Sequence, residues 1–156
     1  MNIFVTSECP IQSAKYLDTK RVNKMILESA QMLSTAMREH GYEGNNVYKS
    51  THKNHPSNIW TRTTRSNYMW LYEHYRALAL EYYQRRGHWH KSWQVLNESL
   101  LEGAKLIPQG KLTPFANCAA NKDKGVSYKH IENTVLAYQM YLGDRWDTDT
   151  REPTWE

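Results

Sequence analysis

Three charged residues, Lys20, Lys24 and Glu28, follow one another at intervals of four. In a helix this spacing stacks side chains on one face, and Arg21 would lie alongside. Such a face could hold phosphates beside a catalytic carboxylate, and clustered positive charges lower the pKa of a lysine and make it a better nucleophile. A solvated face with an ordinary Lys–Glu pair explains the same spacing, and on the residues alone we favour it.

Four histidines form two close pairs, His52 with His55 and His88 with His90. Neutral imidazole is a common metal ligand, and histidine also serves as a general acid or base. Neither pair has a neighbouring cysteine or carboxylate in a known zinc pattern, so we expect no metal and no other cofactor. His55 better fits a position beside a helix N-cap, a phosphate contact or an acid–base group in a cleft.

A third pattern mixes positive charges with aromatic rings. Lysine and arginine contact phosphates and flat rings stack on unpaired bases, so this mixture is typical of proteins that bind nucleic acid. Arg62 and Arg65 lie one helical turn apart, Tyr68 and Trp70 follow, and a denser group spans residues 85–93. The structural alternative is a long amphipathic helix with extended Arg and Lys side chains. Two such groups in one small basic protein favour DNA as the partner.

Composition sets the scale of the molecule. A chain of 156 residues with 40% hydrophobic content fits one domain, residues 1–156, with one core. The net charge of +4 and the pI of about 9.0 permit a polyanionic partner without requiring one. No Walker loop, GxGxxG, GxSxG or HExxH motif is present, which disfavours the standard nucleotide-phosphate enzymes.

The compartment follows from cysteine usage and from the lack of targeting segments. Cys9 and Cys118 are the only cysteines and form no CxxC motif, so we expect two free thiols. No signal peptide is visible, and no apolar run approaches the ~20 residues that span a bilayer. We therefore expect a cytoplasmic protein without a membrane partner.

Apolar periodicity predicts a mostly α fold: a single compact domain of about four helices with one long central helix. The expected helices cover residues 15–40, 56–86, 89–101 with an extension to 106, and 128–142. Asp18 is the expected N-cap of the first and Gly41 its stop, and Pro56 suits the first position of the second.

Three segments are expected to lack helix. Residues 2–5 form a short strand or an extended lead-in, and residues 41–54 form a loop rich in Gly, Asn and Ser. Residues 107–127 form a long irregular segment, and long loops are more often functional than filler.

The stretch "LDTKRVNKMILESAQMLSTA", followed by "THKNHPSNIWTRTTRSNYMWL", resembles a family of small phage proteins. The resemblance covers about residues 1–90 and, more weakly, "LTPFA" and the last helix. The outline is similar to that of phage pyrimidine-dimer DNA glycosylases of the endonuclease V type. Both have an extended start, a charged first long helix, a long central helix ending in "RRG" and a C-terminal "PTW" segment.

This resemblance implies a mechanism. In endonuclease V the α-amine of the processed N-terminus attacks the sugar C1′, and a carboxylate on the first helix assists; α-amines suit this role because their pKa lies well below that of lysine. Asn2 is a bulky second residue that should hinder removal of Met1, so the amine would belong to Met1. The matching carboxylate is Glu28, with Asp18 as its rival, and Lys24 is the other candidate nucleophile.

We therefore expect a phage-type, DNA-acting enzyme, a DNA glycosylase with or without AP-lyase activity, that recognises a damaged or modified base. The alternatives are a non-catalytic phage protein that binds nucleic acid or a host protein, and an enzyme acting on a small nucleotide. The expected catalytic residues are Glu28, Lys24, Met1 and His55. The expected nucleic-acid contacts are Lys20, Arg21, His52, Arg62, Arg65, Tyr68 and Trp70.

Overall fold

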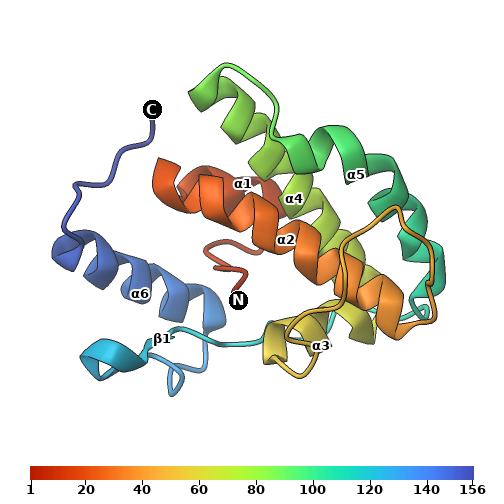
Figure 1. Ribbon diagram of the computed structural model, residues 1–156. Helices are drawn as coiled ribbons and strands as arrows, with labels where there is room; N and C mark the ends of the chain where they lie inside the picture. The colour runs from red at the N-terminus through yellow and green to blue at the C-terminus, as the bar shows by residue number, and fades with distance from the viewer.

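A computed structural model describes residues 1–156, and almost all of its regular structure is helical (Figure 1). The helices are α1 (Pro10–Tyr16), α2 (Thr19–Glu39), α3 (Pro56–Thr63), α4 (Arg65–Arg86), α5 (Lys91–Glu102), the 3-10 helix η1 (Gly103–Leu106) and α6 (Thr134–Thr148). A small hairpin before α6 comprises β1 (Ala120–Asn121), the 3-10 turn η2 (Lys122–Lys124) and β2 (Val126–Ser127). The mostly α class is confirmed, but six α-helices replace the expected four.

The predicted helix over residues 15–40 is two helices, because the chain is extended between α1 and α2. Asp18 occupies the N-cap position of α2, but its carboxylate makes no cap hydrogen bond. It accepts hydrogen bonds from Arg21 and Trp146 instead. Gly41 follows the end of α2 with a φ of 96°, a left-handed conformation that favours glycine, so the predicted stop is confirmed.

The predicted helix over residues 56–86 is interrupted at Thr64, which adopts an extended conformation with φ −136° and ψ 156°. Its hydroxyl oxygen accepts the backbone N–H of Asn67 at 3.1 Å and thereby caps α4. The Asn67 amide donates to the carbonyl of Trp60 at 2.8 Å and ties α4 back to α3. The long central helix is therefore α4 alone, with 22 residues.

The last helix begins later than the predicted residue 128. Asn133 caps α6 by accepting the N–H of Leu136, and the residues before it form a turn in which Ile131 donates to the carbonyl of Tyr128. The segment 107–127 is irregular apart from the hairpin. Residues 2–5 form no regular secondary structure and join no sheet, and the left-handed φ of 59° at Phe4 departs from the predicted strand or extended lead-in.

One apolar core of 32 buried residues joins the helices. Helix α2 packs against α3, α4 and α5, and α1 packs against α4. Figure 1 shows the N-terminus in the middle of the molecule, among α2, α3 and α6. The chain start is therefore placed where three helices can contribute side chains to it.

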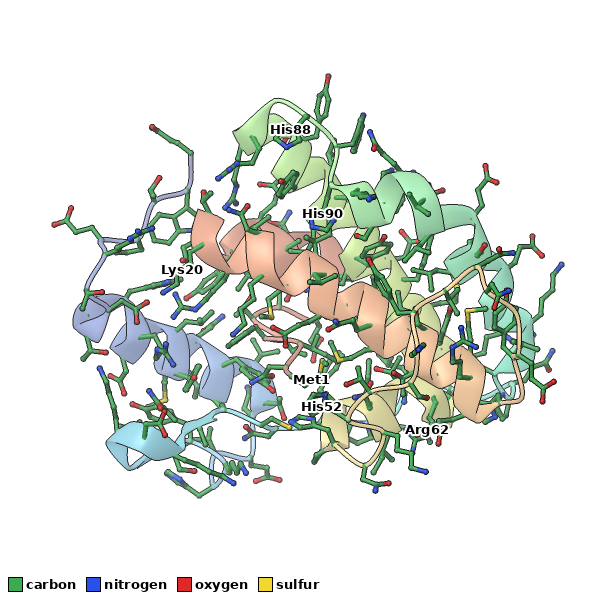
Figure 2. The ribbon with its side chains drawn as sticks, in the orientation of Figure 1. Met1, Lys20, His52, Arg62, His88 and His90 are labelled. Atoms are coloured by element: carbon green, nitrogen blue, oxygen red, sulfur yellow. The ribbon has the colours of Figure 1, made fainter.

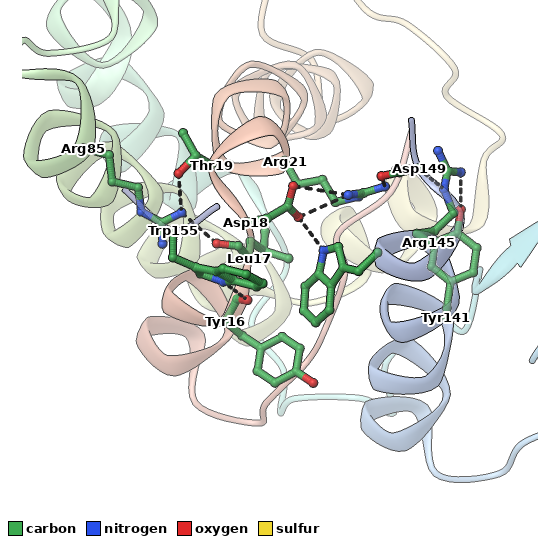
Figure 3. Close-up of polar contacts among 11 residues, drawn as sticks. Tyr16, Leu17, Asp18, Thr19, Arg21, Arg85, Tyr141, Arg145, Asp149 and Trp155 are labelled. Atoms are coloured by element: carbon green, nitrogen blue, oxygen red, sulfur yellow. Dashed lines mark hydrogen bonds and ion pairs between the residues drawn. The ribbon is translucent and has the colours of Figure 1, made fainter. Parts of the chain in front are cut away.

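A buried ionic cluster joins α6 to the start of α2 (Figure 3). Arg21 donates to Asp18 at 3.2 Å and to Asp149 at 2.9 Å. Arg145 donates to Asp149 as well, at 3.3 Å, and Trp146 donates its indole N–H to Asp18 at 2.9 Å. Each carboxylate thus has a charged partner, which a buried ion needs.

The C-terminal tail lies along the junction between α1 and α2. Thr19 donates its N–H to the carbonyl of Thr154 at 2.7 Å, and Trp155 donates its indole N–H to the carbonyl of Tyr16 at 2.9 Å. Both cysteines are free thiols, as predicted. None of the helices combines the length and the apolar character needed to cross a membrane.

Candidate active site

A cavity of about 410 Å³ surrounds the N-terminus and collects side chains from five parts of the chain. Its lining comprises Met1, Asn2, Phe4, Lys24, Met25, Glu28, His55, Pro56, Cys118, Ala120, Lys122, Lys129 and Tyr141. We call it the Met1 cavity. All four residues that the sequence predicted as catalytic, namely Met1, Lys24, Glu28 and His55, line it.

The carboxylate of Glu28 lies between two amines. Its Oε1 is 3.4 Å from the α-amine of Met1, and its Oε2 is 3.8 Å from Nζ of Lys24. The side chains of Met1 and Glu28 are 4% and 13% exposed, whereas that of Lys24 is 70% exposed. The amine and the carboxylate therefore meet in a shielded place, while the lysine extends to solvent.

Asp18, the rival carboxylate, does not line the Met1 cavity. It is 2% exposed and is held by Arg21 and Trp146. Asp18 is the N-cap residue of α2 and Glu28 lies nearer its middle, and only Glu28 lies beside the Met1 amine.

His55 caps α3, with its Nδ1 accepting the N–H of Ser57 at 3.1 Å. In the neutral ring the proton is then on Nε2, which can donate a hydrogen bond. Burial, the Met1 amine, His52 and Lys129 lower the pKa of His55, and Glu28 opposes them. The ring is therefore neutral over a wider pH range than an ordinary histidine.

Positive side chains surround this site. Lys122 of the hairpin and Lys129, two residues after it, line the Met1 cavity; we call residues 120–129 the hairpin segment. Glu28 is the only acidic residue in the cavity wall. A smaller cavity of about 160 Å³, which we call the side cavity, shares Phe4, Lys24, Met25 and Tyr141 with it and adds Lys20, Arg21 and Arg145. The two cavities together favour anionic ligands, because their cations outnumber their one carboxylate.

The structure divides the predicted nucleic-acid contacts. Lys20 lines the side cavity with an exposed side chain. Arg21 reaches the same cavity but is 6% exposed and committed to Asp18 and Asp149, so its main contacts are structural.

The side chains of Arg62 and Arg65 donate hydrogen bonds to backbone carbonyls of neighbouring segments. Arg62 donates to the carbonyl of Lys53 at 2.6 Å, and Arg65 donates to the carbonyls of Lys105 and Ile107, each at 3.2 Å. Neither arginine lines the Met1 cavity or the side cavity. Sequence spacing placed them on one surface but could not reveal these carbonyl partners.

Tyr68 and Trp70 lie in the core, so the prediction that they stack on bases does not fit their burial. Tyr68 is 0% exposed and donates its hydroxyl to the carbonyl of Leu100. Trp70 is 7% exposed, donates to the carbonyl of Glu8 at 2.8 Å and packs against Trp60. Their ring faces are covered by other side chains, which leaves no room for a base.

His52 lies at the turn before α3 and is exposed, with a left-handed φ of 48°. Its carbonyl accepts the side-chain amide of Asn58 at 2.8 Å, which holds the turn. Its charge helps to lower the pKa of the neighbouring His55, and both histidines belong to the region around α3 in Figure 2. His52 does not line the Met1 cavity, so its predicted contact with nucleic acid stays a prediction.

Sequence reasoning missed several wall residues: Asn2, Phe4, Cys118, Lys122, Lys129 and Tyr141. The basic run "KDKGVSYKH" was the one signal that could have found the two lysines, since it interrupts a long loop. No group of three or more His, Cys, Asp or Glu side chains is placed to hold a metal ion.

One family model, described as pyrimidine dimer DNA glycosylase, matches residues 1–95. The matched part supplies Met1, Lys24, Glu28 and His55, while the hairpin and α6 lie beyond it. No curated protein and no solved structure gives a significant match.

Proposed function

The chain belongs to the pyrimidine dimer DNA glycosylase family, and from this premise we propose that it removes a damaged or modified base from DNA, with the α-amine of Met1 as nucleophile and Glu28 as the assisting carboxylate. The observation that carries the proposal is the 3.4 Å contact between this amine and Glu28 inside the Met1 cavity. A shielded amine beside a base is the arrangement that amine catalysis needs.

In the proposed reaction the uncharged Met1 amine attacks C1′ of the deoxyribose with its lone pair. The C1′–N bond to the base breaks, its electron pair leaves with the base, and water supplies the proton that the base takes up. Glu28 accepts the proton that the amine nitrogen loses. The nitrogen lone pair then forms the C=N bond as the bond between C1′ and the ring oxygen breaks, and Glu28 returns its proton to that oxygen. This leaves a protonated imine between Met1 and C1′ that water can hydrolyse.

AP-lyase activity would be a second step on the same imine. Removal of a proton from C2′ provides an electron pair that expels the 3′ phosphate and cuts the strand. Glu28, the one carboxylate in the cavity wall, is proposed to accept this proton.

Two features favour Met1 over Lys24 as the nucleophile. The side chain of Lys24 is 70% exposed, whereas the side chain of Met1 is 4% exposed and the Met1 amine faces a shielded carboxylate. α-Amines in general lose their proton at lower pH than lysine side chains, so a larger share is nucleophilic at neutral pH.

The cations of the two cavities are proposed to bind the DNA backbone. Lys20 and Lys24 approach from α2, and Lys122 and Lys129 from the hairpin segment, so phosphates could be held on both sides of the reacting sugar. None of Lys20, Lys122 and Lys129 is in an ion pair, so their charges are free for a ligand.

The test is borohydride trapping on duplexes that contain a pyrimidine dimer, uracil or an abasic site. Borohydride reduces an imine to a stable amine, and peptide mapping locates the adduct. We expect an adduct on Met1 both in the wild type and in Lys24→Arg, which keeps the charge but cannot form the imine. An adduct on Lys24 would transfer the nucleophile to that residue, and tight, salt-sensitive binding with no adduct and no product would overturn the enzymatic proposal.

A further inference from the structure

The side chain of Asn2 is fixed by four hydrogen bonds. Its Oδ1 accepts the N–H of Ile3 at 2.8 Å, the N–H of Phe4 at 3.4 Å and the hydroxyl of Tyr138 at 2.6 Å. Its Nδ2 donates to the carbonyl of Cys118 at 3.3 Å. An asparagine oxygen bonded to the backbone two residues on forms a local turn, so Asn2 bends the chain beside Met1.

This bend is strained, and its strain is held in place by packing. Phe4 has a φ of 59°, a left-handed conformation that non-glycine residues rarely adopt. Its ring lies 5.9 Å from those of Tyr138 and Tyr141, and its carbonyl accepts the hydroxyl of Ser13 at 3.1 Å. Such a conformation persists only where its surroundings determine it.

Tyr138 is the donor that anchors Asn2 to α6. It is fully buried, and burial raises the pKa of its hydroxyl, so the proton needed for donation is retained. The same oxygen accepts the N–H of Cys118 at 3.0 Å. Asn2, Tyr138 and Cys118 thus form a closed polar unit that joins the chain start to α6 and to the segment before it.

We propose that Asn2 is a positioning residue: held by Tyr138 and Cys118, it bends the chain start so that the α-amine of a retained Met1 faces Glu28. Removal of Met1 would shift the amine along the chain by one Cα–Cα step, about 3.8 Å, and away from the carboxylate. Asn2, whose size disfavours removal of Met1, is therefore also the residue that positions the Met1 amine. The inference rests on the proposed role of the Met1 amine.

The test compares Asn2→Leu, Asn2→Asp and Tyr138→Phe, with intact-protein mass to verify that Met1 is retained in each. Leucine removes all four hydrogen bonds and aspartate keeps the three that Oδ1 accepts. Phenylalanine removes the hydroxyl that donates to Asn2 and accepts the N–H of Cys118. The measurements are the single-turnover rate of borohydride-trapped adduct on abasic duplex, the Kd for the same duplex without borohydride, and thermal unfolding.

We expect Asn2→Leu to form the adduct about 100-fold more slowly, since a misplacement of the order of 1 Å has such effects. We expect the Kd to be unchanged, Asn2→Asp to recover most of the rate, and Tyr138→Phe to fall between them. A wild-type rate in folded Asn2→Leu would overturn the inference and leave the proposed function standing. Absence of a Met1 adduct in the wild type would overturn both.

If Asn2→Leu fails to fold, Tyr138→Phe decides the question alone. A rate loss at unchanged Kd supports positioning, and an unchanged rate contradicts it. A small aldehyde, 2-deoxyribose 5-phosphate, serves as a second probe of the amine, because its trapping on Met1 needs no DNA binding. We expect this labelling to slow in the same order across the variants, and equal labelling in all of them would contradict positioning.

Discussion

Trp146 donates its indole N–H to Asp18 at 2.9 Å, and this contact commits one of the two candidate carboxylates of α2 to the fold. Asp18 completes a buried ionic cluster with Arg21, whereas Glu28 faces the Met1 amine in a cavity. Two carboxylates on one helix therefore have different roles, and mutation can separate them.

Glu28→Gln is expected to lower the reaction rate, whereas Asp18→Asn is expected to lower the stability of the fold. Glu28→Gln should lower single-turnover adduct formation by about 10²–10⁴, the usual contribution of a positioned acid or base, with little change in Kd for DNA. Asp18→Asn should lower stability by about 1–3 kcal/mol, because it weakens the hydrogen bonds of a buried arginine that keeps its pair with Asp149. Rates, DNA affinity and urea unfolding measured on both variants check this, and full turnover in Glu28→Gln would exclude it as the assisting carboxylate.

The hairpin lysines should contribute to DNA binding through charge alone. In a plot of log K against log salt, the Lys122→Ala/Lys129→Ala double variant should show a slope smaller by about 2, equally for damaged and undamaged duplex. Lys105→Ala is the matched control, because Lys105 lies outside the Met1 cavity and pairs with Glu102 at 2.8 Å. An unchanged slope in the double variant would place the DNA elsewhere.

His55 should titrate at lower pH than an ordinary histidine. Burial and nearby positive charges lower its pKa, and Glu28 partly opposes this. NMR titration of the ring should therefore give a lowered pKa in the wild type, a still lower one in Glu28→Gln and a higher one in Lys129→Ala. Identical midpoints in wild type and Glu28→Gln would mean that the carboxylate does not act on this ring.

His74 should make the fold sensitive to acid. Complete burial lowers its pKa to about 4, although its ring nitrogen bonds to the carbonyl of Pro10 at 3.0 Å. Since the ordinary pKa is about 6.5, the unfolded chain binds more protons between these values. The unfolding free energy should thus fall as pH decreases through this window, by up to about 3 kcal/mol.

The variant His74→Gln isolates that effect. Its absolute stability should be lower, because the ring stacks on Trp70 and fills the core. Its pH dependence between about 6.5 and 4 should nevertheless be flatter than that of the wild type. Urea unfolding at several pH values measures both curves, and parallel curves would show that another group carries the acid sensitivity.

Single residues in the sequence predicted several helix ends correctly but did not predict the break between α3 and α4. Gly41 and Pro56 mark boundaries because their backbones have special preferences, and these signals held. The interruption at Thr64 depends on a hydroxyl that caps α4 and on Asn67, which reaches back to Trp60. Side-chain bonds of this kind compete with helix and leave no mark in apolar periodicity.

The site was predictable only where the chain start meets α2 and α3. Met1, Lys24, Glu28 and His55 came from charge spacing and family resemblance, and they line one cavity. Tyr68 could not be assigned in the same way, since the same residue type serves cores and stacking surfaces equally well. Arginines that bind carbonyls look in sequence like arginines that bind phosphates, because both need the same donors.

The hydrogen bond between Asn2 and Tyr138 spans 136 positions of the chain. A ribosome makes the N-terminal end first, so Asn2 lacks its bond to Tyr138 until the residues of α6 have been synthesised and released. Residues 1–95, which the family model matches, are all synthesised before Tyr138, the residue that anchors Asn2. If Met1 supplies the nucleophile as proposed, its amine gains the last of its positioning contacts only once the last helix has been made.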